Sequence, residues 1–152
     1  MRLLILIAAL VVSCAPFTST PAPANSYPMY QYAVQVPTKP VSANERLKLA
    51  WEPQLASGSS TSIYEIQLCV ALFGPWDTVD ALKKAMTTRD TRTCPPPGAS
   101  VASETERVAS NTGARTATEI IVPSAPGFYD LRQISIFSAG NSTSAGAVIE
   151  VR

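Results

Sequence analysis

A regular alternation of apolar and polar side chains near the middle of the chain constrains the fold most strongly. Residues 64–72 read YEIQLCVAL, with apolar side chains at every second position and Glu65, Gln67 and Cys69 between them. This period of two is typical of a half-buried β-strand, because successive side chains of a strand point to opposite faces of the sheet. The same period predicts five more strands, at residues 32–36, 47–51, 116–122, 129–137 and 147–151.

Turn-forming residues separate these predicted strands. Pro37 ends the first strand and Glu52-Pro53 ends the second, where the missing N–H donor of a proline is tolerated. Short strands joined by segments rich in proline, glycine and serine are typical of an antiparallel sandwich. We therefore predict an all-β, antiparallel β-sandwich over residues 32–152.

One segment, residues 76–86, departs from the period of two. Its apolar residues Val79, Leu82 and Met86 fall at helical spacing, and Asp77 stands where a helix N-cap is expected. We predict a helix of about two to three turns, within an insertion at about residues 74–98.

The N-terminal residues have the layout of an export signal. Arg2 supplies a short positive region, and residues 3–12 form an apolar run that leads into Ser13-Cys14. Ten helical residues would span about 15 Å, half of the roughly 30 Å hydrocarbon core, so the run is too short for a membrane-spanning helix. We expect residues 1–13 to be a signal peptide.

The residues Val11-Val12-Ser13-Cys14 resemble the lipobox of bacterial lipoproteins, in which small and aliphatic residues precede an obligatory cysteine. The resemblance implies that a peptidase cuts before Cys14 and that its thiol, the nucleophile in lipid transfer, is attached to diacylglycerol. It also implies an acylated amine and, since Ala15 replaces the aspartate of inner-membrane lipoproteins, delivery to the outer membrane. An ordinary signal peptide, whose cleavage leaves no lipid, is the alternative.

Residues 14–31 are expected to be the lipidated cysteine and a proline-rich tether. Residues 15–31 contain four prolines with serine, threonine and alanine, and no helical or alternating pattern runs through them. Tyr27, Met29, Tyr30 and Tyr32 are more apolar than a spacer requires. They are expected either to pack back onto the domain or to dock on a partner.

Once Cys14 carries lipid, Cys69 and Cys94 are the two cysteines that remain of three. An even pair in an exported protein predicts a disulfide. Closing a loop of about 25 residues stabilises a fold by about 3–4 kcal/mol in the chain-entropy model. Free thiols in a reducing compartment, or a bond to a second chain, are the alternatives.

Composition restricts the chemistry of the chain. The 12 basic residues include Arg2, and removing it with the signal peptide leaves 11 against 11 acidic residues, so the mature domain is neutral. A neutral domain lacks the excess of basic residues with which proteins bind the phosphates of nucleic acid. The chain has no histidine, so it cannot contain an imidazole base, a histidine-based catalytic triad or a metal bound by histidine. We expect a non-catalytic protein without a cofactor or a bound metal.

Several of the predicted strands resemble those of a fibronectin type III domain. Residues 47–53, LKLAWEP, resemble strand B with its buried tryptophan, Trp51. Residues 63–67, which include Tyr64, resemble strand C. The resemblance implies an immunoglobulin-like, fibronectin type III-like sandwich in which Trp51 and Tyr64 are structural residues.

The resemblance continues in residues 127–132, GFYDLR, which look like the start of strand F. There Tyr129 would be structural and would hydrogen-bond the backbone in a tyrosine corner. Tyr129 and Leu131 share one face of this strand, whereas Ile134 and Ile136 fall on the opposite face in a regular strand. We expect a bulge near Gln133 to account for this difference.

Three residues, Trp76, Phe73 and Asn141, are the candidate contacts to a partner. Trp76 and Phe73 lie on the insertion, and aromatic side chains dominate binding hot spots. A small core beneath the helix is the alternative use of both. Asn141 lies in a polar turn that resembles the F–G loop, and loops at the ends of sandwiches commonly bind partners.

Two groups of acidic residues are weaker candidates. Glu104 and Glu106 would share a strand face, as paired catalytic carboxylates do, but no aromatic sugar platform is near them and a solvated edge is favoured. Asp77, Asp80 and Asp90 match no calcium-loop spacing, so a role in the helix N-terminus is favoured.

Together these features predict a non-catalytic, lipid-anchored protein of the cell envelope that binds or scaffolds through its sandwich. The expected partners are the membrane, through the lipid, and a protein or polysaccharide of the cell envelope or surface. The alternative is an accessory lipoprotein subunit docked permanently in a secretion or surface-appendage complex.

Overall fold

The computed structural model describes residues 26–86, 92–105 and 107–152. The elements within them are, in chain order, β1 Tyr27–Val34, β2 Arg46–Ser60, β3 Glu65–Trp76, α1 Val79–Ala85, β4 Val101–Glu104, β5 Val108–Ala109, β6 Thr116–Ile121, β7 Gly127–Phe137 and β8 Ser142–Val151. Cys14 and the predicted signal peptide lie outside the described residues.

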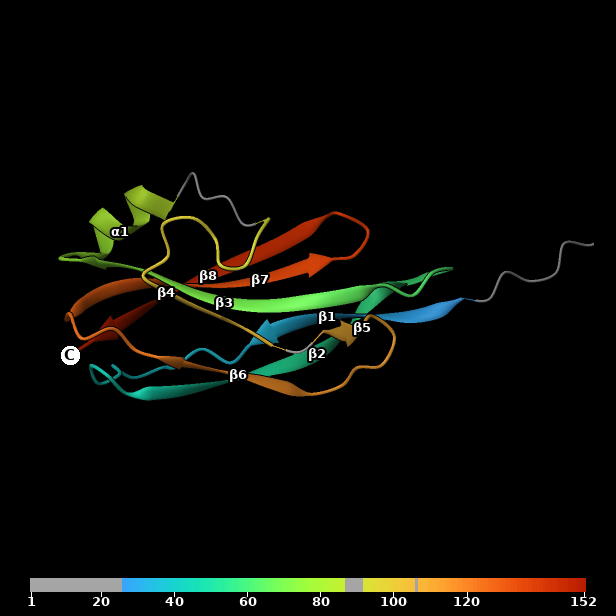
Figure 1. Ribbon diagram of the computed structural model, residues 1–152, viewed down its shortest axis with the longest axis horizontal. Helices are drawn as coiled ribbons and strands as arrows, with labels where there is room; N and C mark the ends of the chain where they lie inside the picture. The colour runs from blue at the N-terminus through green and yellow to red at the C-terminus, as the bar shows by residue number, and fades with distance from the viewer. Residues whose placement is uncertain (1–25, 87–91, 106) are drawn as a thin grey trace, which may run out of the picture.

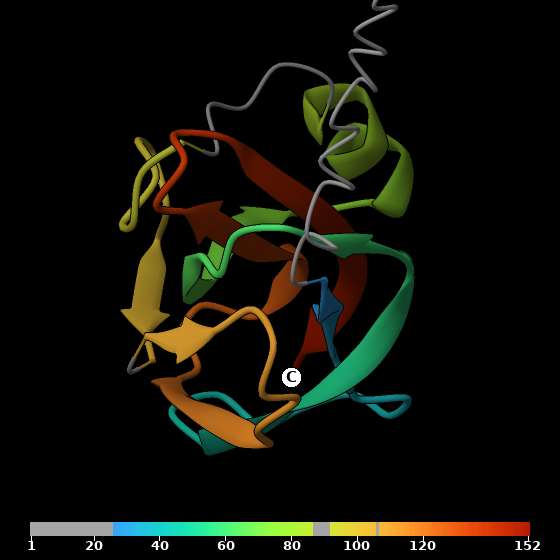
Figure 2. The same ribbon diagram turned by 90° about the vertical axis from the view of Figure 1, so that its right-hand side faces the viewer.

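Two antiparallel sheets pack face to face and enclose the core (Figure 1, Figure 2). One sheet has the strand order β1-β2-β6 and the other has the order β4-β3-β7-β8, with the short β5 also paired to β3. The sequence prediction of an all-β, immunoglobulin-like sandwich is confirmed. The short helix α1 is inserted between β3 and β4, as the sequence predicts.

The core between the sheets includes the indole of Trp51 in β2. This side chain is 1% exposed, and its Nε1 donates a 2.7 Å hydrogen bond to Oγ1 of Thr118 in the adjacent β6. The bond matters because a buried N–H without an acceptor costs about 1–3 kcal/mol. Alternate side chains of β3 complete the same cluster: Ile66, Leu68, Val70 and Leu72.

Tyr129 fixes the corner that leads into β7. Its ring is fully buried, and its hydroxyl donates a 2.8 Å hydrogen bond to the carbonyl of Ala125, four residues earlier. This is the backbone contact of a tyrosine corner. The bond ties the entry of β7 to the core that the ring fills.

Strand β2 is longer than the sequence predicts, because it passes through Pro53 and continues to Ser60. Pairing of β2 with β6 stops at Trp51, which lies opposite the first residue of β6. Beyond Trp51, β2 pairs only with β1. The N–H of Gln35 donates to the carbonyl of Ala50, and hydrogen-bonded and non-hydrogen-bonded residue pairs alternate along an antiparallel ladder. By this alternation Pro53 and its partner Tyr32 form a non-hydrogen-bonded pair, so the nitrogen of Pro53 faces away from β1. Its missing hydrogen therefore removes no ladder bond.

Strand β1 begins at Tyr27, within the segment that the sequence assigns to the tether. Tyr27 pairs with Ser60 of β2, and the N–H of Tyr30 donates a 2.8 Å bond to the carbonyl of Ser110. The ordered domain therefore starts five residues before the predicted boundary at Tyr32. Tyr30 of this segment packs against the core.

The predicted bulge near Gln133 is wrong. The pairing of β7 with both β3 and β8 is continuous through Gln133. Gln133 points inward, and its Oε1 accepts a 2.6 Å hydrogen bond from the N–H of Val34 on the opposite sheet. Ile134 points outward and is fully buried, because the insertion covers the outer face of its sheet.

The N-cap of α1 is Thr78, not Asp77. Thr78 has an extended backbone, and its Oγ1 accepts a 3.1 Å hydrogen bond from the N–H of Ala81. That bond satisfies one of the free N–H groups of the first turn. Asp77 precedes the cap and is exposed.

The tyrosine corner gives a first prediction. Tyr129→Phe should lower the free energy of unfolding by about 1 kcal/mol, the net contribution of one hydrogen bond. Tyr64→Phe, at a half-buried position before β3, is the control and should change it by less than about 0.5 kcal/mol. Urea unfolding monitored by fluorescence measures both. Equal effects would contradict the role of the corner.

A pH dependence follows from the same residue. Burial raises the pKa of Tyr129, and it also raises the pKa of Tyr32. Above pH about 10 the unfolded chain therefore loses these protons before the folded protein does, and stability falls as the pH rises. Urea unfolding between pH about 8 and about 11 should show this loss, and Tyr129→Phe should make it shallower. An unchanged slope in the variant would contradict the assignment.

Candidate functional site

The insertion between β3 and β4 packs on the outer face of the five-stranded sheet (Figure 1). Beneath it lies a second apolar cluster, separate from the core between the sheets. Its members are each no more than 1% exposed, and they are Cys69, Ala71, Phe73, Leu82 and Ile134. Burial of Leu82 holds the helix on the sheet, so α1 packs as part of the domain.

A disulfide between Cys69 and Cys94 holds the far end of the insertion on the same face. The two Cα atoms are 6.1 Å apart, and 25 residues separate the cysteines. Cys69 lies in the middle of β3 and pairs with Ile134 of β7. The predicted disulfide is confirmed, and it leaves Cys14 as the one cysteine outside this bond.

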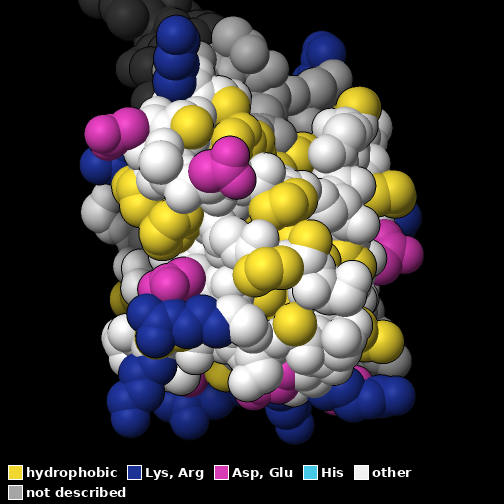
Figure 3. Space-filling view, turned by 90° about the vertical axis from the view of Figure 1, so that its left-hand side faces the viewer, with side chains coloured by type: hydrophobic (Ala, Val, Ile, Leu, Met, Phe, Trp, Pro, Cys, Tyr) yellow, Lys and Arg dark blue, Asp and Glu magenta, His cyan; other side chains and the backbone are white. Residues whose placement is uncertain are grey.

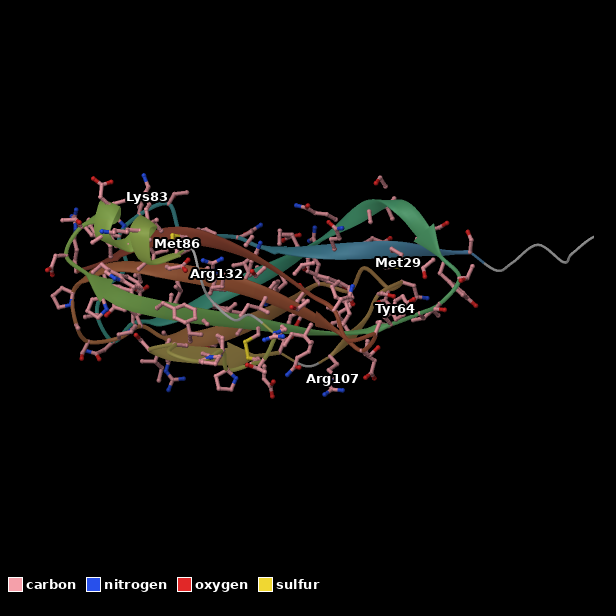
Figure 4. All side chains as sticks on the ribbon, turned by 90° about the horizontal axis from the view of Figure 1, so that it is seen from above. Met29, Tyr64, Lys83, Met86, Arg107 and Arg132 are labelled. Carbon is pink, nitrogen blue, oxygen red and sulfur yellow. A yellow bond between two sulfur atoms is a disulfide. The ribbon has the colours of Figure 1, made fainter. Side chains whose placement is uncertain are left out.

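A buried ion pair lies beside the helix. The Arg132 side chain is 13% exposed and donates to Oδ2 of the fully buried Asp130, with Nη2 2.7 Å and Nε 3.3 Å away. Met86, just after α1, lies above Arg132 (Figure 4). Gly146 of β8 makes room for this arrangement, because a Cβ there would stand 2.7 Å from Oδ1 of Asp130 and 3.0 Å from Cε of Met86.

A shallow hollow of about 200 Å³ opens near the insertion, at the end of the molecule that carries the C-terminus. Its apolar lining comes from the loop after β1 and from β7 and β8, through Pro37, Pro40, Phe128 and Val148. Lys39 and Glu150 also line it. Figure 3 shows this end of the molecule, where hydrophobic side chains lie among lysine, arginine and acidic side chains. We name it the insertion end.

The candidate contact residues occupy three different environments. Phe73 is 1% exposed and belongs to the cluster under the helix, so it is not available to a partner. Trp76 is half-buried and pairs with Phe128, which lines the hollow. Asn141 is exposed in the β7–β8 turn, where its carbonyl accepts a 2.9 Å bond from the N–H of Phe137. The structure therefore brings only Trp76 close to the hollow.

The acidic candidates do not converge. Glu104 is exposed on β4 and accepts a hydrogen bond from Nε2 of Gln67, while Glu106 lies outside the described residues. Asp77 and Asp80 are exposed near the start of α1, and Asp90 also lies outside the described residues. Within the described ranges, no three metal-ligating side chains are grouped closely enough to hold an ion.

A second hollow, of about 250 Å³, lies between the edges of the two sheets at β1 and β8. Gln31, Gln54, Gln133 and Ser135 contribute its polar lining, and none of its lining side chains is a carboxylate, an amine or a thiol. The one phenol in it, Tyr32, has its pKa raised by burial and is neutral near pH 7. These groups can donate and accept hydrogen bonds but offer no acid–base pair.

Two arginines at the insertion end are paired with carboxylates. Nε of Arg152 lies 2.7 Å from Oε1 of Glu150, and this bond and the carboxylate charge raise the pKa of the Arg152 guanidinium. Arg132 is likewise bonded to Asp130. Among the described helices, none is long and apolar enough to cross a bilayer.

Comparison of the chain with protein-family models and with curated proteins gives no match.

The hollow at the insertion end could not be found from the sequence. Its lining joins residues 37–40 to residues 128 and 148–150, which are far apart in the chain. One local signal was present, since Val148 stands on the outward side of an alternating strand and is 36% exposed. An apolar side chain at an outward position marks a surface that is partly covered or available to a partner.

The contact of β8 with the ion pair gives the next prediction. Gly146→Ala should lower the free energy of unfolding by about 1–3 kcal/mol, because the new methyl group overlaps Asp130 and Met86. Gly58→Ala is the matched control: it meets nothing within 4 Å and should change stability by no more than about 0.5 kcal/mol. Urea unfolding measures both variants. Equal effects would contradict close packing between β8 and the insertion.

Proposed function

We propose that this chain is a non-catalytic, lipid-anchored protein of the bacterial cell envelope that binds or scaffolds through a fibronectin type III-like domain. The observation that carries the proposal is the Cys69–Cys94 disulfide. It uses two of the three cysteines and leaves Cys14, which directly follows the apolar run of the signal peptide. A disulfide of this kind is typical of proteins that fold in an oxidising compartment outside the cytoplasm.

The arrangement of the domain supports a tethered binder. The described chain enters at one end of the sandwich, at Tyr27, whereas α1 lies at the opposite end (Figure 1). A lipid on Cys14 would therefore attach the domain at the end opposite the insertion. The insertion end has an aromatic residue, Trp76, next to a hollow with apolar walls, and aromatic residues are enriched at binding hot spots.

A non-catalytic role is supported by the chemistry of the described residues. The larger hollow has no carboxylate, amine or thiol, and the hollow at the insertion end contains one lysine and one glutamate. Neither set forms the nucleophile–base or paired-carboxylate arrangement of a hydrolase. A protein or polysaccharide of the cell envelope is the proposed partner.

The alternative, an accessory subunit docked through the tether aromatics, has less support. It requires residues 27–32 to be ordered against another chain. In this structure those residues form β1 and pair with β2 of the same domain.

Metabolic labelling with a radioactive fatty acid tests the anchor. The wild-type protein should carry label and stay with the membrane fraction, and Cys14→Ala should carry no label and be released. Cys94→Ser is the control, because it removes the disulfide and leaves the predicted lipid site intact. Label on Cys14→Ala would contradict the lipoprotein assignment.

Site-specific cross-linking in intact envelopes tests the binding end. Val148→Asp places a charge at the hollow and should abolish cross-links that the wild-type domain forms with its partner. Ile121→Asp is the control, since Ile121 is 53% exposed on β6 and does not line the hollow. Unchanged cross-linking in Val148→Asp would count against the insertion end as the binding surface.

A further inference from the structure

The end of the sandwich opposite the insertion is built from segments without a charged residue. Four ranges meet there: 27–31, 53–64, 108–114 and 138–145. We name this surface the neutral end. Pairing of Tyr27 with Ser60 joins the first two ranges, and the carbonyl of Ser110 joins the third to Tyr30. The N–H of Ser138 bonds the carbonyl of Glu65, which brings the fourth range alongside.

The nearest charges at this end neutralise each other. Arg107 and Glu65 flank the uncharged ranges, and Nη1 of the arginine lies 3.3 Å from Oε2 of the glutamate. Their side chains are both well exposed, so the pair lies at the rim of the surface. Glu52 and Arg115 also flank the uncharged ranges, with Nε of the arginine 3.4 Å from Oε2 of the glutamate. The neutral end thus presents no net charge to whatever faces it.

Exposed apolar side chains and half-buried aromatic ones gather on the same surface. Leu55 is 66% exposed and Ile63 is 48% exposed. Three half-buried tyrosines belong to the neutral end, and they are Tyr27, Tyr30 and Tyr64. Tyr32, at its edge, is 7% exposed and belongs to the core. Met29 and Tyr64 both lie at the end where the described chain begins (Figure 4).

The position of Cys14 indicates what faces this surface. Thirteen chain steps separate Cys14 from Tyr27, so the lipid site is at most about 45 Å from the neutral end. No charged residue occurs between Cys14 and Thr38. Because Tyr27 belongs to the neutral end, the chain that leads from Cys14 enters the domain there.

We propose that the neutral end lies on the lipid bilayer, with Leu55 and Ile63 entering the interface and the half-buried tyrosines of this end at headgroup depth. This rests on the proposed lipid anchor at Cys14. Uncharged surface is favoured there because a charge moved toward hydrocarbon loses its hydration. Tyrosine suits the interface since one end of its ring is apolar and the other is polar.

The contact gives the domain a fixed orientation. The lipid alone leaves the domain free to turn about its tether, whereas a second apolar contact holds one end against the membrane. The long axis of the sandwich then points away from the bilayer, and the hollow beside Trp76 faces outward. Asp80, Lys83 and Lys84, all exposed on α1, remain in water.

Quenching by brominated lipid tests the contact. The full-length lipidated protein is reconstituted in phosphatidylcholine vesicles with and without bromine on the acyl chains. Leu55→Trp should lose fluorescence in the brominated vesicles after subtraction of the signal from the native tryptophans. Ile121→Trp is the matched control: Ile121 is also more than half exposed but lies opposite Arg46, away from the neutral end, and should keep its fluorescence. Ile63→Trp supplies a second probe if Leu55→Trp does not fold.

Flotation of the same vesicles separates the two proposals. Protein that floats while neither Leu55→Trp nor Ile63→Trp is quenched overturns the membrane contact and leaves the anchor standing; the neutral end would then be a surface for a protein. Protein that fails to float contradicts the anchor, and the membrane contact fails with it. Quenching that disappears when Ile63→Asp is combined with Leu55→Trp supports insertion of the apolar tip.

Discussion

The disulfide between Cys69 and Cys94 is the constraint on which most of this structure depends. Cys69 sits on the outward side of the central strand β3, so the bond attaches the loop after α1 to the middle of a sheet. This cover buries Ile134 and Phe73 on a face that would otherwise meet water. In the chain-entropy model a closed loop of this length contributes about 3–4 kcal/mol. The same bond accounts for two cysteines, and the anchor proposal for Cys14 follows from that count.

The sequence was informative where one local pattern determines the structure. The alternation around Ile66 and Leu68 predicted β3, and Trp51 and Tyr129 occupy the buried positions expected of them. Prediction failed where contacts with segments distant in the chain determine the burial and pairing of a residue. The sequence predicts a bulge near Gln133, because nothing in this strand itself reveals that the insertion covers Ile134.

The same limit explains the other differences. Pro53 does not end β2, since pairing with β6 has already stopped at that point and no partner needs the missing donor. The site was harder to predict than the fold. Trp76 was identified as a candidate, but its strand partner Phe128 lies about 50 residues further along the chain. Only folding brings Phe128 and Val148 to one hollow.

The central claim is that the domain is lipid-anchored through Cys14, with its neutral end on the bilayer and its insertion end outward. Neutron reflectometry of the full-length lipidated protein on a supported bilayer tests this directly. We expect a protein layer that begins at the headgroups, without water between, and extends along the long axis of the sandwich. A water layer between headgroups and protein, or a layer as thin as the short axis of the domain, would contradict it.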